Sequence, residues 1–172
     1  GLSNYMLSFN RYNRAFIHWW GNDLPGFIHS ADDALAICYD QTSRQVIDYY
    51  VIKALALQEL YRTSEATEEI WKAHKFANFT TDQANILAAA SGEARLNLIR
   101  GNLDAAEEWL HSAEHTHIDP TSLWWCEDPA ITRCRVLISL DSKKDLKTAL
   151  ELLKQHQHYS ESVFNRIRII ET

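Results

Sequence analysis

The stretch Asn97–Ala113, NLIRGNLDAAEEWLHSA, contains the features that decide the fold. Gly101 stands where a helix is expected to end, because glycine adopts the left-handed C′ conformation without a steric penalty from a Cβ atom. Asn102 and Asp104 follow it and are suited to cap a second helix and to place negative charge at its start. The stretch therefore predicts a helix, a tight turn and a second helix.

The second helix of this stretch has a face suited to close packing. Ala106, Leu110 and Ala113 stand at positions i, i+4 and i+7, which places them on one side of the helix. The two alanines permit a neighbouring helix to approach closely, and Leu110 fills the space between them. We therefore expect the second helix to lie against the first.

The same arrangement recurs at a period of roughly forty residues. Turns that break helices are expected near residues 21, 63, 101 and 142. Small residues in the helices that follow are spaced 39 and 40 apart, at Ala34, Ala73 and Ala113. Repeated helix pairs bury their apolar faces on one another in solenoids. The predicted fold is an all-α, right-handed, tetratricopeptide-like superhelix of about four antiparallel helix pairs, forming one domain over residues 1–172.

The expected helix boundaries follow from capping residues and apolar periodicity. Ser64 is the expected N-cap of the fourth helix, and Pro129 is expected to delay the regular part of the seventh. The third helix is apolar over most of its circumference and should lie well inside the stack. Thr80, Thr81 and Asp82 are competing caps for the fifth helix, which is expected to end at Arg100, and Thr121 or Ser122 is expected to start the seventh, which ends near 140. The other expected helices are 3–20, 24–39, 43–62, 64–78, 103–115 and 144–159, with the start of a ninth at 162–172.

Composition and charge narrow the class of protein. A formal net charge of −6 disfavours direct nucleic-acid contact, which needs a basic face. Three cysteines favour a reducing, cytoplasmic compartment, and no apolar run of about 18 residues predicts a membrane span. The chain begins at Gly1 and ends within the repeat pattern at Thr172, so we expect a fragment of a larger protein.

The run LWWCEDPAITRCRVLISL, followed by a turn and DLKTALELLKQHQ, resembles the helical-repeat region of MalT-like, ATP-dependent LuxR-type transcriptional regulators. RGNLDAAEEWL is similar to the turn and helix that precede this region in the family. Cys134 replaces the usual alanine, and Asp141-Ser142 replaces the usual glycine turn. The resemblance is specific over residues 101–153, whereas the first hundred residues match generic repeats. The residues that carry it are Glu127, Thr132, Arg135, Val136, Leu137, Ile138, Ala149, Leu150, Leu152 and Leu153.

The resemblance implies a sensor or oligomerisation segment without catalysis. In the family, such a segment binds a small inducer or a partner protein and couples this binding to self-association. ATP would bind only a module upstream of this segment, and DNA only a helix-turn-helix downstream, so no cofactor is expected here. The alternative function is a general scaffold for protein–protein interaction, of tetratricopeptide type.

The sequence supports a metal site or an enzyme activity less well than it supports a binding function. His111 and His115 share a helix face at a spacing that can bind zinc, but no paired cysteines at short spacing accompany them. The neighbouring acids Asp32-Asp33, Glu68-Glu69 and Glu107-Glu108 diverge by about 100° on a helix, so they are interpreted as solvated faces. His156 and His158 are likewise expected to be solvated. We therefore predict no enzyme activity and no metal site.

Adjacent aromatic residues are the best sequence hint of a binding surface. Trp19-Trp20, Tyr49-Tyr50 and Trp124-Trp125 cannot each place both members in one core, so one member of each pair is expected to line a concave groove or to pack on a neighbouring repeat. Arg135 is expected to pair with Glu127 or Asp128 inside the stack. The predicted ligand-binding residues of the groove are Tyr49, Lys53, Arg95 and Trp125.

Overall fold

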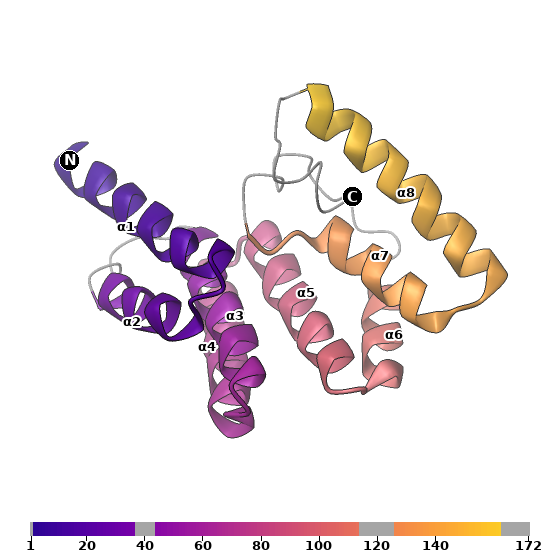
Figure 1. The fold of residues 1–172 in the computed structure, drawn as a ribbon, viewed down its shortest axis with the longest axis horizontal. Helices are drawn as coiled ribbons and strands as arrows, with labels where there is room; N and C mark the ends of the chain where they lie inside the picture. The colour runs from indigo at the N-terminus through magenta and orange to yellow at the C-terminus, as the bar shows by residue number, and fades with distance from the viewer. Residues whose placement is uncertain (1, 37–43, 114–125, 163–172) are drawn as a thin grey trace. The chain divides into compact units, whose positions relative to one another are not determined.

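The computed structural model describes residues 2–36, 44–113 and 126–162, and the regular structure in these ranges is entirely helical (Figure 1). The prediction of an all-α fold is confirmed for these residues. Residues 163–172, expected to begin a ninth helix, lie outside them. The helices are α1 (Leu2–Trp20), α2 (Leu24–Leu35), α3 (Arg44–Glu59), α4 (Thr63–Thr80), α5 (Gln83–Ile99), α6 (Leu103–Ser112), α7 (Pro129–Leu140) and α8 (Lys143–Ser162).

One residue in the left-handed backbone conformation separates the two helices of each pair. Asn22, Tyr61, Gly101 and Asp141 have φ angles of 57°, 59°, 74° and 53°, and they follow one another at intervals of 39, 40 and 40 residues. A further left-handed residue, Thr81, with φ of 53°, lies between the second and third pairs. The predicted period of about forty residues is therefore confirmed at the level of the turns.

The turns end their helices by a common hydrogen-bond pattern. The N–H of Gly101 donates to the carbonyl of Leu98 at 3.0 Å, and the N–H of Asn102 donates to the carbonyl of Asn97 at 2.9 Å. The same two bonds follow Asn22 and Tyr61 at the ends of α1 and α3. This Schellman arrangement satisfies carbonyls that a helix end otherwise leaves without partners.

Two of the expected N-caps are wrong, and one proline has a clearer role than predicted. Arg62, rather than Ser64, precedes α4, and it makes no side-chain cap. Asn102 precedes α6 but does not cap it, and its amide instead donates to Oδ1 of Asn97 at 3.4 Å. Pro129 begins α7, where its missing N–H is not needed, and Asp128 caps this helix by accepting from the N–H of Ala130 at 2.9 Å.

The chain divides into two compact units, residues 1–85 and 86–172, where we expected a single repeat domain. The core of the first unit is an aromatic cluster from α1, α2 and α3. Phe16 contacts Tyr12, Phe27 and Tyr49, with ring centroids 4.3, 5.5 and 6.2 Å away. Helix α3 is buried over most of its surface, as its apolar sequence predicts.

A buried carboxylate joins α1 to α3 within the first unit. Asp48 is fully buried, accepts from Nη1 of Arg44 at 2.7 Å and accepts from the hydroxyl of Tyr12 at 2.5 Å. A buried charge is tolerated when it is both paired and hydrogen-bonded, and both conditions hold here.

The core of the second unit contains the face predicted from the opening stretch. Ala106, Leu110 and Ala113 are all buried and pack in one cluster with residues of α5, α7 and α8. Across the described residues of both units, no helix is sufficiently long and apolar to cross a membrane. The cluster consists of Ala94, Ala106, Trp109, Leu110, Ala113, Val136, Leu137 and Ala149.

Replacing Tyr61 by glycine is expected to raise the unfolding free energy by about 0.5–1 kcal/mol, since a bulky residue in the left-handed conformation carries strain that glycine does not. The Tyr61 ring is 92% exposed, so its removal sacrifices little packing. Urea unfolding followed by circular dichroism measures the change. The reciprocal control, Gly101→Ala, meets no atom within 4 Å of the added Cβ and should lower stability through backbone strain alone. A Tyr61→Gly chain less stable than the parent would contradict this account.

Candidate functional site

Tyr49, the first predicted groove residue, lies in the core of the first unit. Its side chain is fully buried, with ring centroids 5.7 Å from Tyr12 and 6.2 Å from Phe16. Because the aromatic cluster covers the ring, Tyr49 does not line an open groove. The prediction that Tyr49 lines a ligand-binding groove is therefore corrected. The side of α3 that carries Tyr49 packs against Tyr12 and Phe16 of α1.

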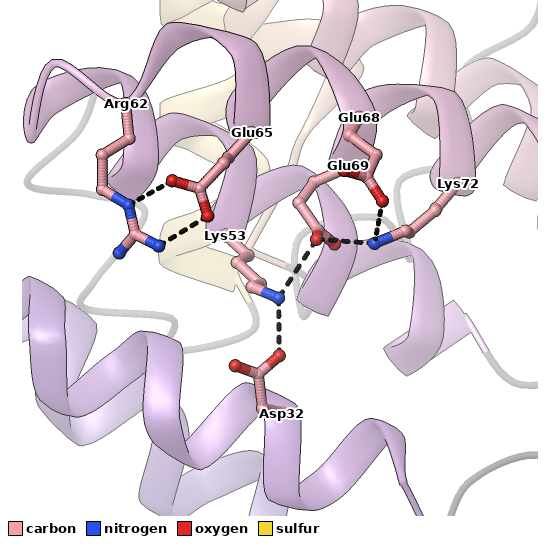
Figure 2. A network of polar contacts seen from close by, with 7 residues as sticks. All are labelled: Asp32, Lys53, Arg62, Glu65, Glu68, Glu69 and Lys72. Atoms are coloured by element: carbon pink, nitrogen blue, oxygen red, sulfur yellow. Dashed lines mark hydrogen bonds and ion pairs between the residues drawn. The ribbon is translucent and has the colours of Figure 1, made fainter.

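Lys53, one turn further along α3, is held between two carboxylates from other helices (Figure 2). Its Nζ atom lies 2.5 Å from Oδ1 of Asp32 on α2 and 3.1 Å from Oε1 of Glu69 on α4. The Lys53 side chain is 12% exposed and that of Glu69 is 7% exposed. Lys53 therefore connects three helices of the first unit, and its charge is neutralised within the protein.

The same polar network continues along α4. Lys72 Nζ lies 2.9 Å from Glu68 Oε1 and 3.0 Å from Glu69 Oε1, so Glu69 is shared by two lysines (Figure 2). Burial lowers the pKa of Lys72, but its hydrogen bonds to Glu68 and Glu69 outweigh this effect and hold its pKa above the ordinary value. The interpretation of Glu69 as solvated is wrong, because these two cations compensate its burial.

Arg62 and Glu65 form an exposed pair at the start of α4. Nε and Nη2 of Arg62 each donate to a different oxygen of Glu65 at 2.6 Å, as Figure 2 shows. The backbone turn at Tyr61 places Arg62 directly before the helix, three residues from Glu65. The hydrogen bonds from Arg62 lower the pKa of Glu65, and both side chains remain about half exposed.

Arg95, the third predicted groove residue, lies on α5 in the second unit and faces a buried carboxylate. Its Nη1 is 3.3 Å from Oε2 of Glu127, which is fully buried. Oε1 of Glu127 accepts from the hydroxyls of Ser91 and Thr132, both at 2.6 Å. Glu127 thus joins α5 to the start of α7.

The electrostatics of Glu127 also involve Arg135. Burial raises the pKa of the Glu127 carboxyl, but the charges of Arg95 and Arg135 and the hydroxyls of Ser91 and Thr132 outweigh burial, so its pKa is below the ordinary value. Nη1 of Arg135 donates to Oγ1 of Thr132 at 3.5 Å. Trp125, the fourth predicted groove residue, lies outside the described residues.

A second buried acid joins α7 to α8, and sequence reasoning missed it. Nε2 of His156 lies 3.1 Å from Oδ2 of the fully buried Asp128, although the atoms are not aligned for a hydrogen bond. The His156 side chain is only 12% exposed, so its interpretation as solvated is wrong. No sequence signal could have paired these residues, because they are 28 positions apart.

The predicted zinc ligands are only partly described. His111 is exposed, with Nε2 3.7 Å from Glu107 on its own helix, whereas His115 and His117 lie outside the described ranges. Cys134 is buried, and burial raises the pKa of its thiol to about 11. Within the described ranges, no group of three or more His, Cys, Asp and Glu side chains is placed to hold a metal ion.

Described residues of α1 and α2 line one cleft in the first unit, and described residues of α5 and α6 line another in the second. The cleft between α1 and α2 measures about 370 Å³, and that between α5 and α6 measures about 340 Å³. The residues that line the α5–α6 cleft include three alanines, the buried Trp109 and the exposed Glu93 and Glu108. The α1–α2 cleft is lined by Arg11, Arg14, Ser30, Asp33 and Ala36.

These features define the class of protein as all-α, with helix pairs repeated at a common interval and charges compensated between neighbouring helices. No family model matches the chain, and no curated protein matches its sequence.

Replacing Lys53 by methionine is expected to lower the unfolding free energy by about 1–3 kcal/mol, because the largely buried Glu69 then retains only Lys72 as a partner. Urea unfolding at neutral pH measures the change. Lys147→Met is the matched control: its amine lies 3.9 Å from Glu151 and its side chain is 79% exposed, so stability should change by less than about 0.5 kcal/mol. Equal effects of the two substitutions would show that Lys53 is not needed to hold the helices together.

Replacing Glu127 by glutamine is expected to lower stability by about 3 kcal/mol at pH 7, since Arg95 and Arg135 lose their buried counter-charge. The folded pKa of Glu127 is below its ordinary value of 4.5, so the carboxylate stabilises the fold above pH 4.5. That stabilisation disappears as the pH falls through the lowered pKa. Urea unfolding at a series of pH values should show parent and variant converging in acid, and a difference independent of pH would contradict this assignment.

Proposed function

We propose that the chain is a non-catalytic binding module of tandem helix pairs and serves as the sensor segment of a MalT-like transcriptional regulator in the cytoplasm. The observation that carries the proposal is the left-handed turn residue at positions 22, 61, 101 and 141, which marks four helix pairs of a common period. Tandem helix pairs of this kind stack into extended binding surfaces. The proposal includes their assembly into a right-handed, tetratricopeptide-like superhelix.

The residues that carry the resemblance to the MalT-like family support the regulator form of this proposal. Val136, Leu137 and Ala149 meet in one buried cluster with Ala106 and Leu110 of the similar preceding helix. These three positions are therefore packing positions that connect α6, α7 and α8, whereas Ile138 and Leu150, which also carry the resemblance, are 47% and 53% exposed. In this proposal, the segment takes up a small inducer or a regulatory protein and passes the signal to self-association, ATP binding and DNA binding elsewhere in the protein.

The arrangement of neighbouring carboxylates supports binding rather than acid–base catalysis. Asp32 lies 2.5 Å from Lys53 on α3, whereas the adjacent Asp33 lies 3.6 Å from His29, one turn earlier on α2 itself. A general acid and base must converge on one reacting group. These two carboxylates diverge, and each is directed at a different partner within its own unit.

A specific surface feature favours the alternative function, a scaffold for protein–protein interaction. Trp71 and Phe79 on α4 are 59% and 78% exposed, and the amine of Lys75 lies 5.0 Å from the centroid of the Trp71 ring. Trp71 and Phe79 lie about two turns apart on one helix, and exposed aromatic residues are effective anchors for a protein partner. In the scaffold function, the partner protein would bind the exposed aromatic residues of α4, whereas the sensor function does not require them.

A thermal-shift screen against sugars, aromatic acids, amino acids, nucleotides and zinc tests the sensor function. We expect one chemical class to raise Tm by roughly 5–10 °C at a hundredfold excess over Kd, since such binding adds about 2.7 kcal/mol of stability. The double variant Trp71→Ser, Phe79→Ser is the control and should retain the shift. Absence of a shift with every class would contradict the small-inducer form and leave the scaffold as the function.

A further inference from the structure

The cleft between α1 and α2 is lined by two arginines that, unlike most other lysines and arginines of the first unit, form no ion pair with a described carboxylate. Arg44, Lys53, Arg62 and Lys72 lie within ion-pair distance of carboxylates, and Lys75 lies over Trp71. Among the described residues of this unit, Arg11 and Arg14 are the remaining lysine or arginine side chains, and neither has a carboxylate within ion-pair distance. Both line the cleft. In a chain of net charge −6, two guanidinium groups that form no ion pair with a described residue thus meet at one hollow, which Asp33 also lines.

The two arginines share a helix face and one of them is already oriented. Arg11 and Arg14 stand at positions i and i+3 on α1, which brings their side chains together on one side of the helix. Nη1 of Arg11 donates to the backbone carbonyl of Asp33 at 3.4 Å, so the guanidinium is held across the cleft toward α2. A guanidinium carries five N–H donors, which leaves donors of Arg11 for a ligand.

The opposite wall supplies a hydroxyl and a carboxylate. Ser30 and Asp33 stand one turn apart on α2, and both line the cleft with Ala36. The Asp33 carboxylate is 69% exposed, and its Oδ2 lies 3.6 Å from Nε2 of His29. A carboxylate at this position accepts hydrogen bonds from hydroxyl groups and repels a second anionic group. The cleft therefore has two arginines that can bind an anion on its α1 side, and on its α2 side a carboxylate that can accept hydrogen bonds from hydroxyl groups.

We propose that the α1–α2 cleft binds a small sugar phosphate, with its phosphate on Arg11, Arg14 and Ser30 and its hydroxyls on Asp33. Guanidinium groups match the geometry of phosphate oxygens and form charge-assisted bonds with them. The volume of about 370 Å³ lies within the range of roughly 300–1,000 Å³ typical of small-molecule sites. The proposal depends on the chemistry of this cleft alone, so it holds or fails independently of the regulator function.

Isothermal titration calorimetry of the 172-residue chain with three probes tests the ligand class. Glucose 6-phosphate should bind at least tenfold more tightly than inorganic phosphate, and glucose should bind more weakly than either, because only the first probe uses both walls. Lack of binding by glucose 6-phosphate at millimolar concentration would overturn the proposal. Equal affinity for inorganic phosphate would overturn the role of the sugar hydroxyls.

Three variants test the residues. Arg14→Gln should weaken glucose 6-phosphate binding by at least tenfold, whereas Arg14→Lys should lose less, because lysine keeps the charge without the bidentate geometry. Asp33→Ala should weaken glucose 6-phosphate several-fold and leave inorganic phosphate binding no weaker. Lys144→Gln, an exposed residue of α8 outside the cleft, removes the same charge and should have no effect.

Circular dichroism separates a binding defect from a folding defect in these variants. Arg14 is exposed and makes no ion pair with a described residue, so Arg14→Gln should unfold at the same temperature as the parent. Unchanged affinity in a folded Arg14→Gln chain would contradict the proposal. An equal loss of affinity in Lys144→Gln would show that only the net charge of the chain matters, and this result would also overturn the proposal.

Discussion

Each helix pair depends on one residue that holds the left-handed backbone conformation between its two helices. A helix cannot reverse direction within three residues unless its final carbonyls find donors and the chain leaves the helical conformation at once. Asn22, Tyr61, Gly101 and Asp141 meet this requirement at nearly equal intervals. Glycine, asparagine and aspartate adopt this conformation readily, whereas Tyr61 does so at a cost in strain. The reversals bring the apolar faces of successive helices together, and the cores of both units follow from them.

Buried carboxylates then specify which helices meet. Asp48, Glu69 and Glu127 are almost completely buried, and each contacts a cation or hydroxyl donor. An isolated charge in such a position would be expelled or protonated, so the fold is stable only when the correct partner helix supplies its donors. Glu127 illustrates this requirement, since it needs α5 for Ser91 and Arg95 and the first turn of α7 for Thr132. These interactions select one packing arrangement among the many that apolar faces alone permit.

The same compensation explains why the predicted groove residues differ from the residues available to a ligand. Tyr49, Lys53 and Arg95 look suited to recognition in sequence, but their partners are other parts of the protein. Other charged side chains line the clefts within helix pairs, Arg11 and Arg14 in one and Glu93 and Glu108 in the other. The two clefts thus present opposite charge, which suits them to different classes of ligand.

The sequence by itself determined the helical class, the interval of the turns and the faces that pack. Gly101, the alanines of α6 and the apolar circumference of α3 act through local conformation and helical periodicity, which neighbouring residues in the chain encode directly. Only the tertiary structure decided which charges are compensated, because Lys53 with Asp32 and Asp128 with His156 are pairs separated by 21 and 28 positions. It also decided that Glu69 is buried, that Tyr49 is covered and that Arg11 and Arg14 face a cleft. A side chain's exposure and partners depend on how helices pack, and local periodicity carries no information about charges that arrive from another helix.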